Sequence, residues 1–89
     1  YVEVFRDISA RICPIRKEDV REMVMELRSN PLITGVRGIR PIDIASLEEL
    51  MVRVCRIMVE EDIEEMDLNP VVFDERGYDI VDVRIRRGV

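Results

Sequence analysis

Residues Glu64–Phe73 read EEMDLNPVVF, a stretch that alternates like a strand but carries Asp67, Asn69 and Pro70 near its middle. Alternation of apolar and polar side chains predicts a half-buried β-strand. Asp, Asn and Pro are depleted in sheets, and Pro also lacks the N–H that a sheet ladder uses. A strand that only had to pack would not carry them, so we expect its polar face to have a second role.

A second strand-like segment follows a turn. Residues 74–77 read DERG, and Gly77 suits a turn position with positive φ. We therefore predict a hairpin of two strands, Ile63–Phe73 and Tyr78–Arg86. Because residues two apart in a strand share a face, the expected core side carries Met66, Leu68, Val72, Val81, Val83 and Ile85.

The opposite face of the predicted hairpin carries Asp67, Asn69, Asp82, Arg84 and Arg86. A four-residue turn over 74–77 would place Asn69 directly opposite Asp82, with their Cβ atoms roughly 5 Å apart. A two-residue turn over 76–77 would make the same pair a diagonal at about 7–8 Å. Either register brings the amide oxygen of Asn69 close to the carboxylate of Asp82.

This Asn–Asp pair has two interpretations. The two side chains offer hard oxygen ligands that suit one Mg²⁺, which takes only one or two protein oxygens beside water and substrate phosphates. Alternatively, the D-x-N-P stretch is a solvated face with a local Asx turn, and Asp82 pairs with Arg84 or Arg86. Spacing alone leaves both open.

The rest of the chain predicts a β-α-α-β-β order. Tyr1–Cys13 has the composition of one long strand or two short ones, and Lys17–Arg28 has the spacing of an amphipathic helix. A long loop over 31–45 (PLITGVRGIRPIDIA) follows, and Ser46 with Glu49 forms a capping box that predicts the start of a second helix. The expected buried stripe of that helix is Leu47, Leu50, Met51, Val54, Ile57 and Met58. The fold class is α+β, with an antiparallel sheet packed on two helices.

Composition limits the possible functions. The chain has 89 residues, enough for one small domain over 1–89, and its opening in strand-like sequence suggests a piece of a longer polypeptide. Nineteen acidic against fourteen basic residues give a net charge of -5, which argues against nucleic-acid binding. No membrane-length apolar run and no signal peptide are visible, so a cytoplasmic protein without membrane contact is expected.

The cysteines predict no active chemistry. Cys13 and Cys55 lie far apart and the chain has no histidine, so neither a zinc pattern nor a redox pair is indicated. We expect two buried core thiols. The absence of histidine also excludes a Ser-His or Cys-His nucleophile within this chain.

Several stretches together resemble a known family. These are MDLNPVVF and YDIVDVRI around the glycine turn, with YVEVFRDISARICPI and ELRSNPLITGVRGIRPIDI upstream. In this order they resemble the C-terminal part of the ATP-grasp domain of NDP-forming acyl-CoA synthetases. ADP-forming acetyl-CoA synthetase is most similar and succinyl-CoA synthetase more distant. The resemblance implies an ATP-grasp C-terminal subdomain that belongs to a larger chain.

The resemblance also implies an activity and a set of site residues. Such enzymes interconvert acyl-CoA, ADP and phosphate with the free acid, CoA and ATP, through a phosphohistidine on another, CoA-binding subunit or domain. The positions that hold Mg²⁺ on the nucleotide phosphates are Asn69 and Asp82. Asp67 matches a catalytic Glu that acts with the phosphohistidine in succinyl-CoA synthetases, and its shorter side chain leaves a second-metal or orienting role open. Arg37, between two glycines, suits either an anion or a solvated loop.

Alternatives to an active enzyme remain. The phosphate-binding lysines of the family lie in a preceding part, and this chain has only Lys17, so we expect the piece alone to be inactive and to supply one wall of the site. A non-catalytic, regulatory acyl-CoA synthetase-like module, as in some protein acetyltransferases, is one alternative. A plain α+β interaction domain is another.

Overall fold

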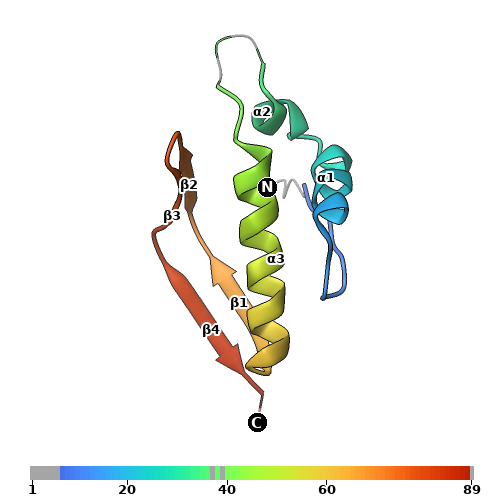
Figure 1. Cartoon of the computed structure of the whole chain (residues 1–89), viewed down its shortest axis with the longest axis vertical. Coiled ribbons are helices and arrows are strands. Elements are labelled where there is room, and N and C mark those ends of the chain that lie inside the picture. The colour runs from blue at the N-terminus through green and yellow to red at the C-terminus, as the bar shows by residue number, and fades with distance from the viewer. Residues whose placement is uncertain (1–6, 37, 39, 89) are drawn as a thin grey trace, which may run out of the picture.

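A long helix runs through the middle of the molecule, with a shorter helix on one side and a bent, two-stranded ribbon on the other (Figure 1). The structure is a computed structural model that describes residues 7–36, 38 and 40–88. The elements within these residues are α1 Lys17–Glu26, α2 Asn30–Thr34, α3 Ile44–Glu60, β1 Ile63–Leu68, β2 Val71–Asp74, β3 Gly77–Ile80 and β4 Val83–Arg87. The α+β class expected from the sequence is confirmed.

The N-terminal segment differs from the prediction. Residues 1–6 of the predicted strand Tyr1–Cys13 lie outside the described residues, and residues 7–13 form no strand. The Asp7 carboxylate accepts hydrogen bonds from the backbone N–H groups of Arg28 and Ser29, at 2.6 and 3.0 Å. The Ser29 side chain contributes most to lowering the pKa of Asp7. At Asp7, side-chain bonds to the backbone just after α1 therefore take the place of strand pairing.

Glu26 of α1 also binds the N-terminal segment, and this contact depends on pH. Its carboxylate accepts hydrogen bonds from the Arg11 guanidinium, at 2.9 Å, and from the Ser9 hydroxyl, at 2.7 Å. The bond from Arg11 has the larger effect, and together with the bond from Ser9 it lowers the pKa of Glu26 from 4.5 to about 2. Since the folded chain favours the ionised form, the contact stabilises the fold above pH 4.5 and is lost as the pH falls from 4.5 toward 2.

This contact predicts an acid-dependent loss of stability. A Glu26→Gln variant is expected to unfold with a shallower dependence on pH between 4.5 and 2 than the wild type. Urea unfolding across this range, together with an NMR titration of the Glu26 carboxyl, measures the effect. Glu18→Gln, at an exposed position on the same helix, is the control and should keep the wild-type slope. Equal slopes for wild type and Glu26→Gln would contradict the assignment.

Helix α2 lies inside the predicted loop over 31–45. Pro31 occupies its first turn, where a missing N–H costs nothing. The loop resumes at Gly35, where a side chain would be strained because φ is 107° and because an added Cβ would lie 3.2 Å from Pro41 Cβ. Arg37 lies outside the described residues. None of the described helices has the length and apolar character needed to cross a membrane.

Helix α3 begins earlier than the predicted capping box. The Asp43 carboxylate accepts the backbone N–H of Ala45 at 3.1 Å, and the Ser46 hydroxyl also donates to it at 3.1 Å. The prediction of a cap at Ser46 and Glu49 was wrong, because Asp43 captures the free N–H groups one turn earlier. Glu49 instead pairs with Arg53 one turn along the helix, at 3.3 Å.

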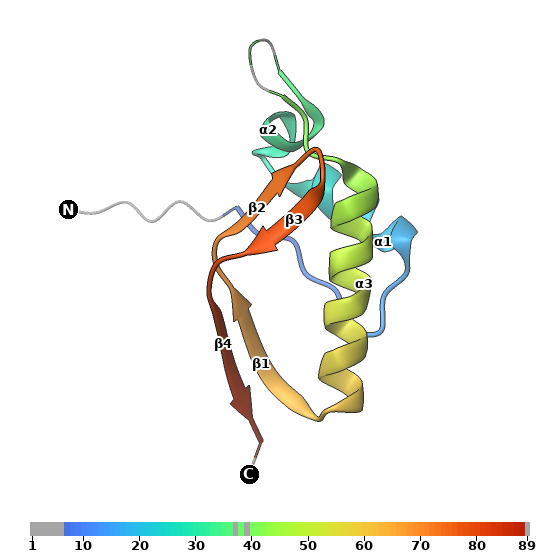
Figure 2. The ribbon, with the colours of Figure 1, turned by 60° about the vertical axis from the view of Figure 1, so that its left-hand side comes forward.

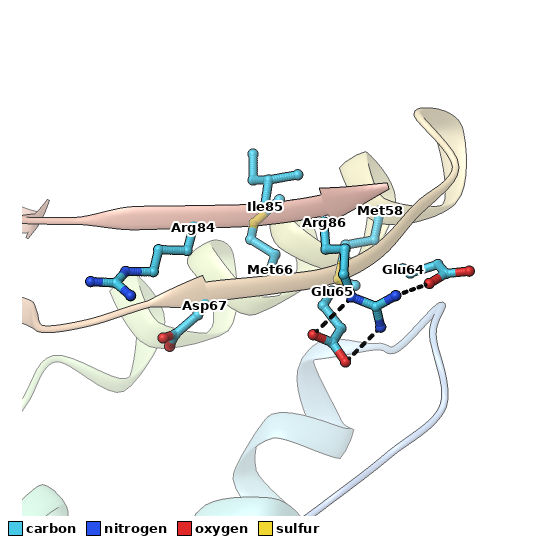
Figure 3. Close-up of a pocket in the computed structure, with 8 residues that line it drawn as sticks. All are labelled: Met58, Glu64, Glu65, Met66, Asp67, Arg84, Ile85 and Arg86. Carbon is cyan, nitrogen blue, oxygen red and sulfur yellow. Dashed lines mark hydrogen bonds and ion pairs between the residues drawn. The ribbon is translucent and has the colours of Figure 1, made fainter. Parts of the chain in front are cut away.

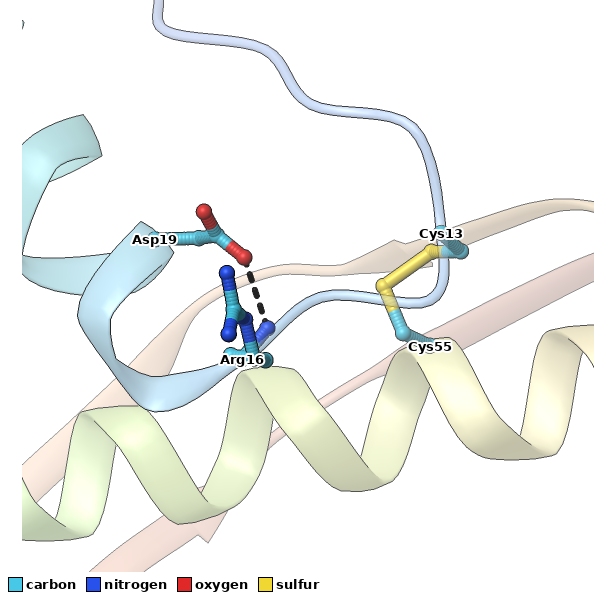
Figure 4. Close-up of a disulfide and its surroundings, with 4 residues drawn as sticks. All are labelled: Cys13, Arg16, Asp19 and Cys55. Carbon is cyan, nitrogen blue, oxygen red and sulfur yellow. Dashed lines mark hydrogen bonds between the residues drawn. A yellow bond between two sulfur atoms is a disulfide. The ribbon is translucent and has the colours of Figure 1, made fainter.

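The core lies between α1 and α3 and is closed by a disulfide. Val20 of α1 is fully buried and packs with Ile15 and Cys55, and the surrounding half-buried side chains are Cys13, Leu47, Met51 and Val52. Cys13 and Cys55 are bonded to each other, with Cα atoms 5.3 Å apart (Figure 4). The prediction of two free core thiols was therefore wrong, because the segment before α1 folds back onto α3.

A charged pair also joins the two helices. The Glu48 side chain is only 6% exposed, and the exposed Arg21 guanidinium donates to it at 3.3 Å. Burial of a carboxylate is costly without such a partner. The ion pair with Arg21 thus allows Glu48 of α3 to be buried against α1.

Each predicted hairpin strand is broken in two. β1 pairs antiparallel with β4, and β2 pairs antiparallel with β3. Between the two ladders lie Asn69–Pro70 on one strand and Val81–Asp82 on the other. Figure 2 shows the ribbon bending there, so that β2 and β3 lean toward α2 while β1 and β4 run beside α3. Pro70 contributes to this break because it has no backbone N–H to donate to the opposite strand.

The break also changes which side chains face the helix. A cavity of about 290 Å³ beside α3 is lined by Met66, Leu68, Tyr78, Ile80 and Val83, among others. Ile80 and Val83 are three apart, so the alternation shifts by one residue across the break. Val72 and Val81, which were predicted to be core residues, are 50% and 66% exposed. Val83 and Ile85 also remain about half exposed, at 45% and 53%.

Candidate functional site

The bend in the ribbon places Asn69 opposite Asp82. Asp67 pairs with Arg84 below the bend and Phe73 pairs with Tyr78 above it, so one register continues through the gap. The backbone N–H of Asn69 donates to the Asp82 carbonyl at 3.1 Å. This is the directly opposed register of the two that the sequence allowed, and the diagonal one is excluded.

The turn that fixes this register has two residues, at 75–76, where the sequence suggested four over 74–77 or two at 76–77. Asp74 pairs with Gly77, which leaves Glu75 and Arg76 as the turn residues. Gly77 has a φ of 133°, and the Asp74 carboxylate accepts the Arg76 N–H at 2.7 Å. Glycine at 77 is therefore required by the backbone, as the sequence indicated.

The side chains at the bend are open to solvent. Within the described part of the chain, the side chains of Asp67 and Asn69 make no hydrogen bond or ion pair, and both residues are exposed. Asp82 is 58% exposed and accepts one contact, from Arg84 Nε to Oδ2 at 3.4 Å. The pairing of Asp82 with Arg84, which the sequence offered as an alternative, is present in this structure.

The donor set fits a cation that needs few protein ligands. Among the described residues, no three His, Cys, Asp or Glu side chains gather closely enough to enclose a metal ion. An amide oxygen and a carboxylate from facing strand positions suit Mg²⁺, which keeps water and substrate oxygens in its other positions. Asn69 and Asp82 could therefore supply part of a coordination shell.

Next to the bend, the β1–β4 ladder carries a row of charges over a hollow of about 580 Å³ (Figure 3). Arg86 donates to Glu64 at 2.6 Å and contacts Glu65 at 2.8 Å. The Arg86 guanidinium lowers the pKa of Glu65. Sequence reasoning named Arg86 but missed its two glutamates, although Glu65 lies two residues before Asp67 and so shares its face.

A family model described as an ATP-grasp domain matches residues 1–86. The chain belongs to this family. This ATP-grasp chain is similar to named enzymes along nearly all of its length. It is 42% identical to acetate–CoA ligase [ADP-forming] I of Archaeoglobus fulgidus over 89 residues, which are 99% of this chain and 13% of that protein. It is 37% identical to the beta subunit of acetate–CoA ligase [ADP-forming] I of Pyrococcus furiosus, over 96% of this chain and 37% of that subunit.

The fold also matches a solved relative, dinucleotide forming acetyl-coenzyme A synthetase 1 of Ca. Korarchaeum cryptofilum. Its complex with coenzyme A, acetyl-coenzyme A and a phosphorylated phosphohistidine segment matches with a TM-score of 0.83 and 43% identity, over 92% of this chain and 37% of that one. A complex with coenzyme A and Mg-AMPPCP, whose phosphohistidine segment points towards the nucleotide binding site, matches with a TM-score of 0.76 and 42% identity, over 84% and 36%. The ATP-grasp chain thus spans well under half of each of these relatives.

Proposed function

We propose that this ATP-grasp chain forms part of the nucleotide-binding domain of an ADP-forming acyl-CoA synthetase. The reaction interconverts acyl-CoA, ADP and phosphate with the free acid, CoA and ATP. The observation that carries the proposal is the register at the bend, where Asn69 lies opposite Asp82 and keeps its side chain free. The named relatives support the same reaction class.

Asn69 and Asp82 are the proposed holders of the metal. Because the Asn69 backbone bonds across to Asp82, the two positions are kept together. Among the described residues the Asn69 side chain has no partner, and the Asp82 carboxylate has only the 3.4 Å contact with the exposed Arg84. A Mg²⁺ ion bound there would orient the nucleotide phosphates and offset the negative charge that develops on the transferred group. Neither side chain needs to act as a base or a nucleophile.

Asp67 is the proposed contact for the phosphohistidine of the CoA-binding partner. It lies two residues before Asn69, is exposed, and is unpaired within the part of the chain that the structure describes. A carboxylate at this place could accept the N–H of an imidazole ring and hold the ring in one orientation. The solved relative that contains a phosphorylated phosphohistidine segment supports such a partner.

The chain is proposed to supply one wall of the site and to be inactive alone. It spans 13% of one relative and 37% of another, so further parts must contribute the remaining phosphate-binding groups in such enzymes. The exposed apolar side chains of the ribbon, Val72, Val81, Val83 and Ile85, are consistent with cover from further protein.

A paramagnetic titration tests the proposed metal site. Backbone-amide NMR spectra of the chain are recorded with increasing Mn²⁺, with and without ADP. We expect the signals of Asn69 and Asp82 to broaden first, while those of the buried Val20 on the far side of α3 survive. The experiment is repeated on the complete polypeptide that carries this sequence. If neither sample shows selective broadening at these two residues, the metal site is wrong.

A further inference from the structure

Arg84 and Arg86 occupy the same face of β4 but have different surroundings. Arg86 is held by Glu64 and Glu65, and Figure 3 shows its guanidinium between them. Arg84 is 81% exposed, against 60% for Arg86, and the one ion pair that it makes with other described residues is the 3.4 Å contact with Asp82. Asp67, its cross-strand partner, makes no ion pair with it within the described residues. Arg84 is therefore a loosely held cation beside a proposed metal ligand.

The contact of Arg84 conflicts with metal binding. Its Nε lies 3.4 Å from Asp82 Oδ2, an oxygen that the proposed Mg²⁺ would also approach. Two positive groups on one carboxylate repel each other, and at this exposed bend solvent screening keeps the repulsion modest. A metal ion that arrives alone must therefore displace Arg84 or accept its repulsion.

A bound nucleotide would reduce the repulsion between Arg84 and the metal. Its phosphates bring negative charge to the metal, and a guanidinium binds two phosphate oxygens at once through its parallel N–H groups. Arg84 has a long, exposed side chain that can leave Asp82 without breaking any other ion pair among the described residues. Its position next to the ligand pair places such a phosphate within its reach.

We propose that Arg84 is a phosphate-binding residue that neutralises Asp82 in the empty site and moves onto a phosphate of the nucleoside diphosphate when metal and nucleotide bind together. The inference rests on the proposed function. This role of Arg84 makes metal binding and nucleotide binding mutually dependent. The metal alone competes with Arg84 for the Asp82 carboxylate, whereas the metal–nucleotide pair offers Arg84 a phosphate instead.

The test measures binding in the complete polypeptide that carries this sequence. Arg84→Ala is expected to bind Mn²⁺ alone about fivefold more tightly, because a competing positive charge has been removed. The same variant is expected to bind ADP at saturating Mn²⁺ about tenfold more weakly, because a charged hydrogen-bonding partner has been lost. Electron paramagnetic resonance of free Mn²⁺ and calorimetry with ADP give the two constants.

Arg86→Ala is the matched control, because it removes the same side chain two residues along the same strand. The Arg86→Ala variant should leave the Mn²⁺ and ADP binding constants within about twofold of wild type. Arg86 lies farther than Arg84 from the proposed metal site, so solvent and salt screen its charge more. Arg84→Lys keeps the charge without the planar fork, so its Mn²⁺ affinity should stay near wild type while its ADP affinity falls. Amide spectra of each variant confirm that the fold is retained.

The outcomes separate the two proposals. If Asn69→Ala and Asp82→Ala leave Mn²⁺ affinity unchanged, the metal site is wrong and the role of Arg84 falls with it. If those two variants weaken Mn²⁺ binding but Arg84→Ala does not shift the two constants in opposite directions, the Arg84 inference is overturned and the metal site stands. Opposite shifts in Arg84→Ala with an unchanged Arg86→Ala support the inference.

Discussion

Replacing Asp82 with alanine in the complete polypeptide that carries this sequence is expected to reduce the proposed nucleotide-dependent phosphoryl transfer about a hundredfold, and Asn69→Ala should have an effect of similar size. Each change removes one of the two protein oxygens proposed to hold the metal on the phosphates. Both residues are exposed at the bend, so the free energy of unfolding should change by less than about 0.5 kcal/mol. Loss of activity without loss of stability is the expected signature.

Asp79 provides the control for this prediction. It is an exposed aspartate on β3 of the same ribbon, and it carries no ion pair among the described residues. Asp79→Ala should leave the rate within about twofold, since its charge lies away from the bend. The rates are compared at saturating and limiting Mg²⁺, because a weakened metal site is partly rescued by more metal. Full activity in Asp82→Ala would contradict the assigned role.

Opening the Cys13–Cys55 bond is expected to cost about 2–4 kcal/mol of unfolding free energy. The bond closes a loop across a sequence separation of 42 residues, and it ties the segment before α1 to the middle of α3. The described core around it is small, with Val20 as its one fully buried side chain. A loss of this size is a large fraction of the stability that a domain of this length has.

Denaturation in urea with and without reductant measures this loss, and a thiol titration of the native chain counts free sulfhydryl groups. Cys13→Ser under non-reducing conditions should match the reduced wild type, because Cys13 is half-buried and tolerates the hydroxyl. Adding reductant to this variant should change nothing further. Two free thiols in the unreduced native chain, with no effect of reductant, would refute the bond.

The sequence predicted the register of the site better than the shape of the ribbon. Turn chemistry at Gly77 and strand alternation are local, and they brought Asn69 close to Asp82 in either of two registers. The structure has the directly opposed one. The misfit of Asn69 and Pro70 in a strand was also visible, and it was interpreted either as a metal site or as a solvated face with a local Asx turn, but not as a break in both strands. In the structure the same residues interrupt the ladder as well, and the exposed Val72 and Val81 follow from that interruption.

Other features depend on contacts between distant segments, which periodicity does not contain. Asp7 accepts a bond from Arg28, 21 residues away and just after α1, and residues 7–13, the described part of the expected strand, form no strand. The pairing of Cys13 with Cys55 likewise needs the N-terminal segment to lie on α3. The α3 cap was a local error, because Asp43 was an equally suitable cap and lay three residues before Ser46.

The gap between the two ladders also affects how this domain can evolve. Side chains at the gap are exposed and contribute little to packing. Substitutions at Asn69 or Asp82 would therefore change stability too little to be removed by selection for folding. Under the proposed function, a lineage could therefore lose the metal site in one mutational step and keep an intact, well-folded domain. Duplicated copies without the proposed metal contacts would still fold, and they could take on other binding roles without an unstable intermediate.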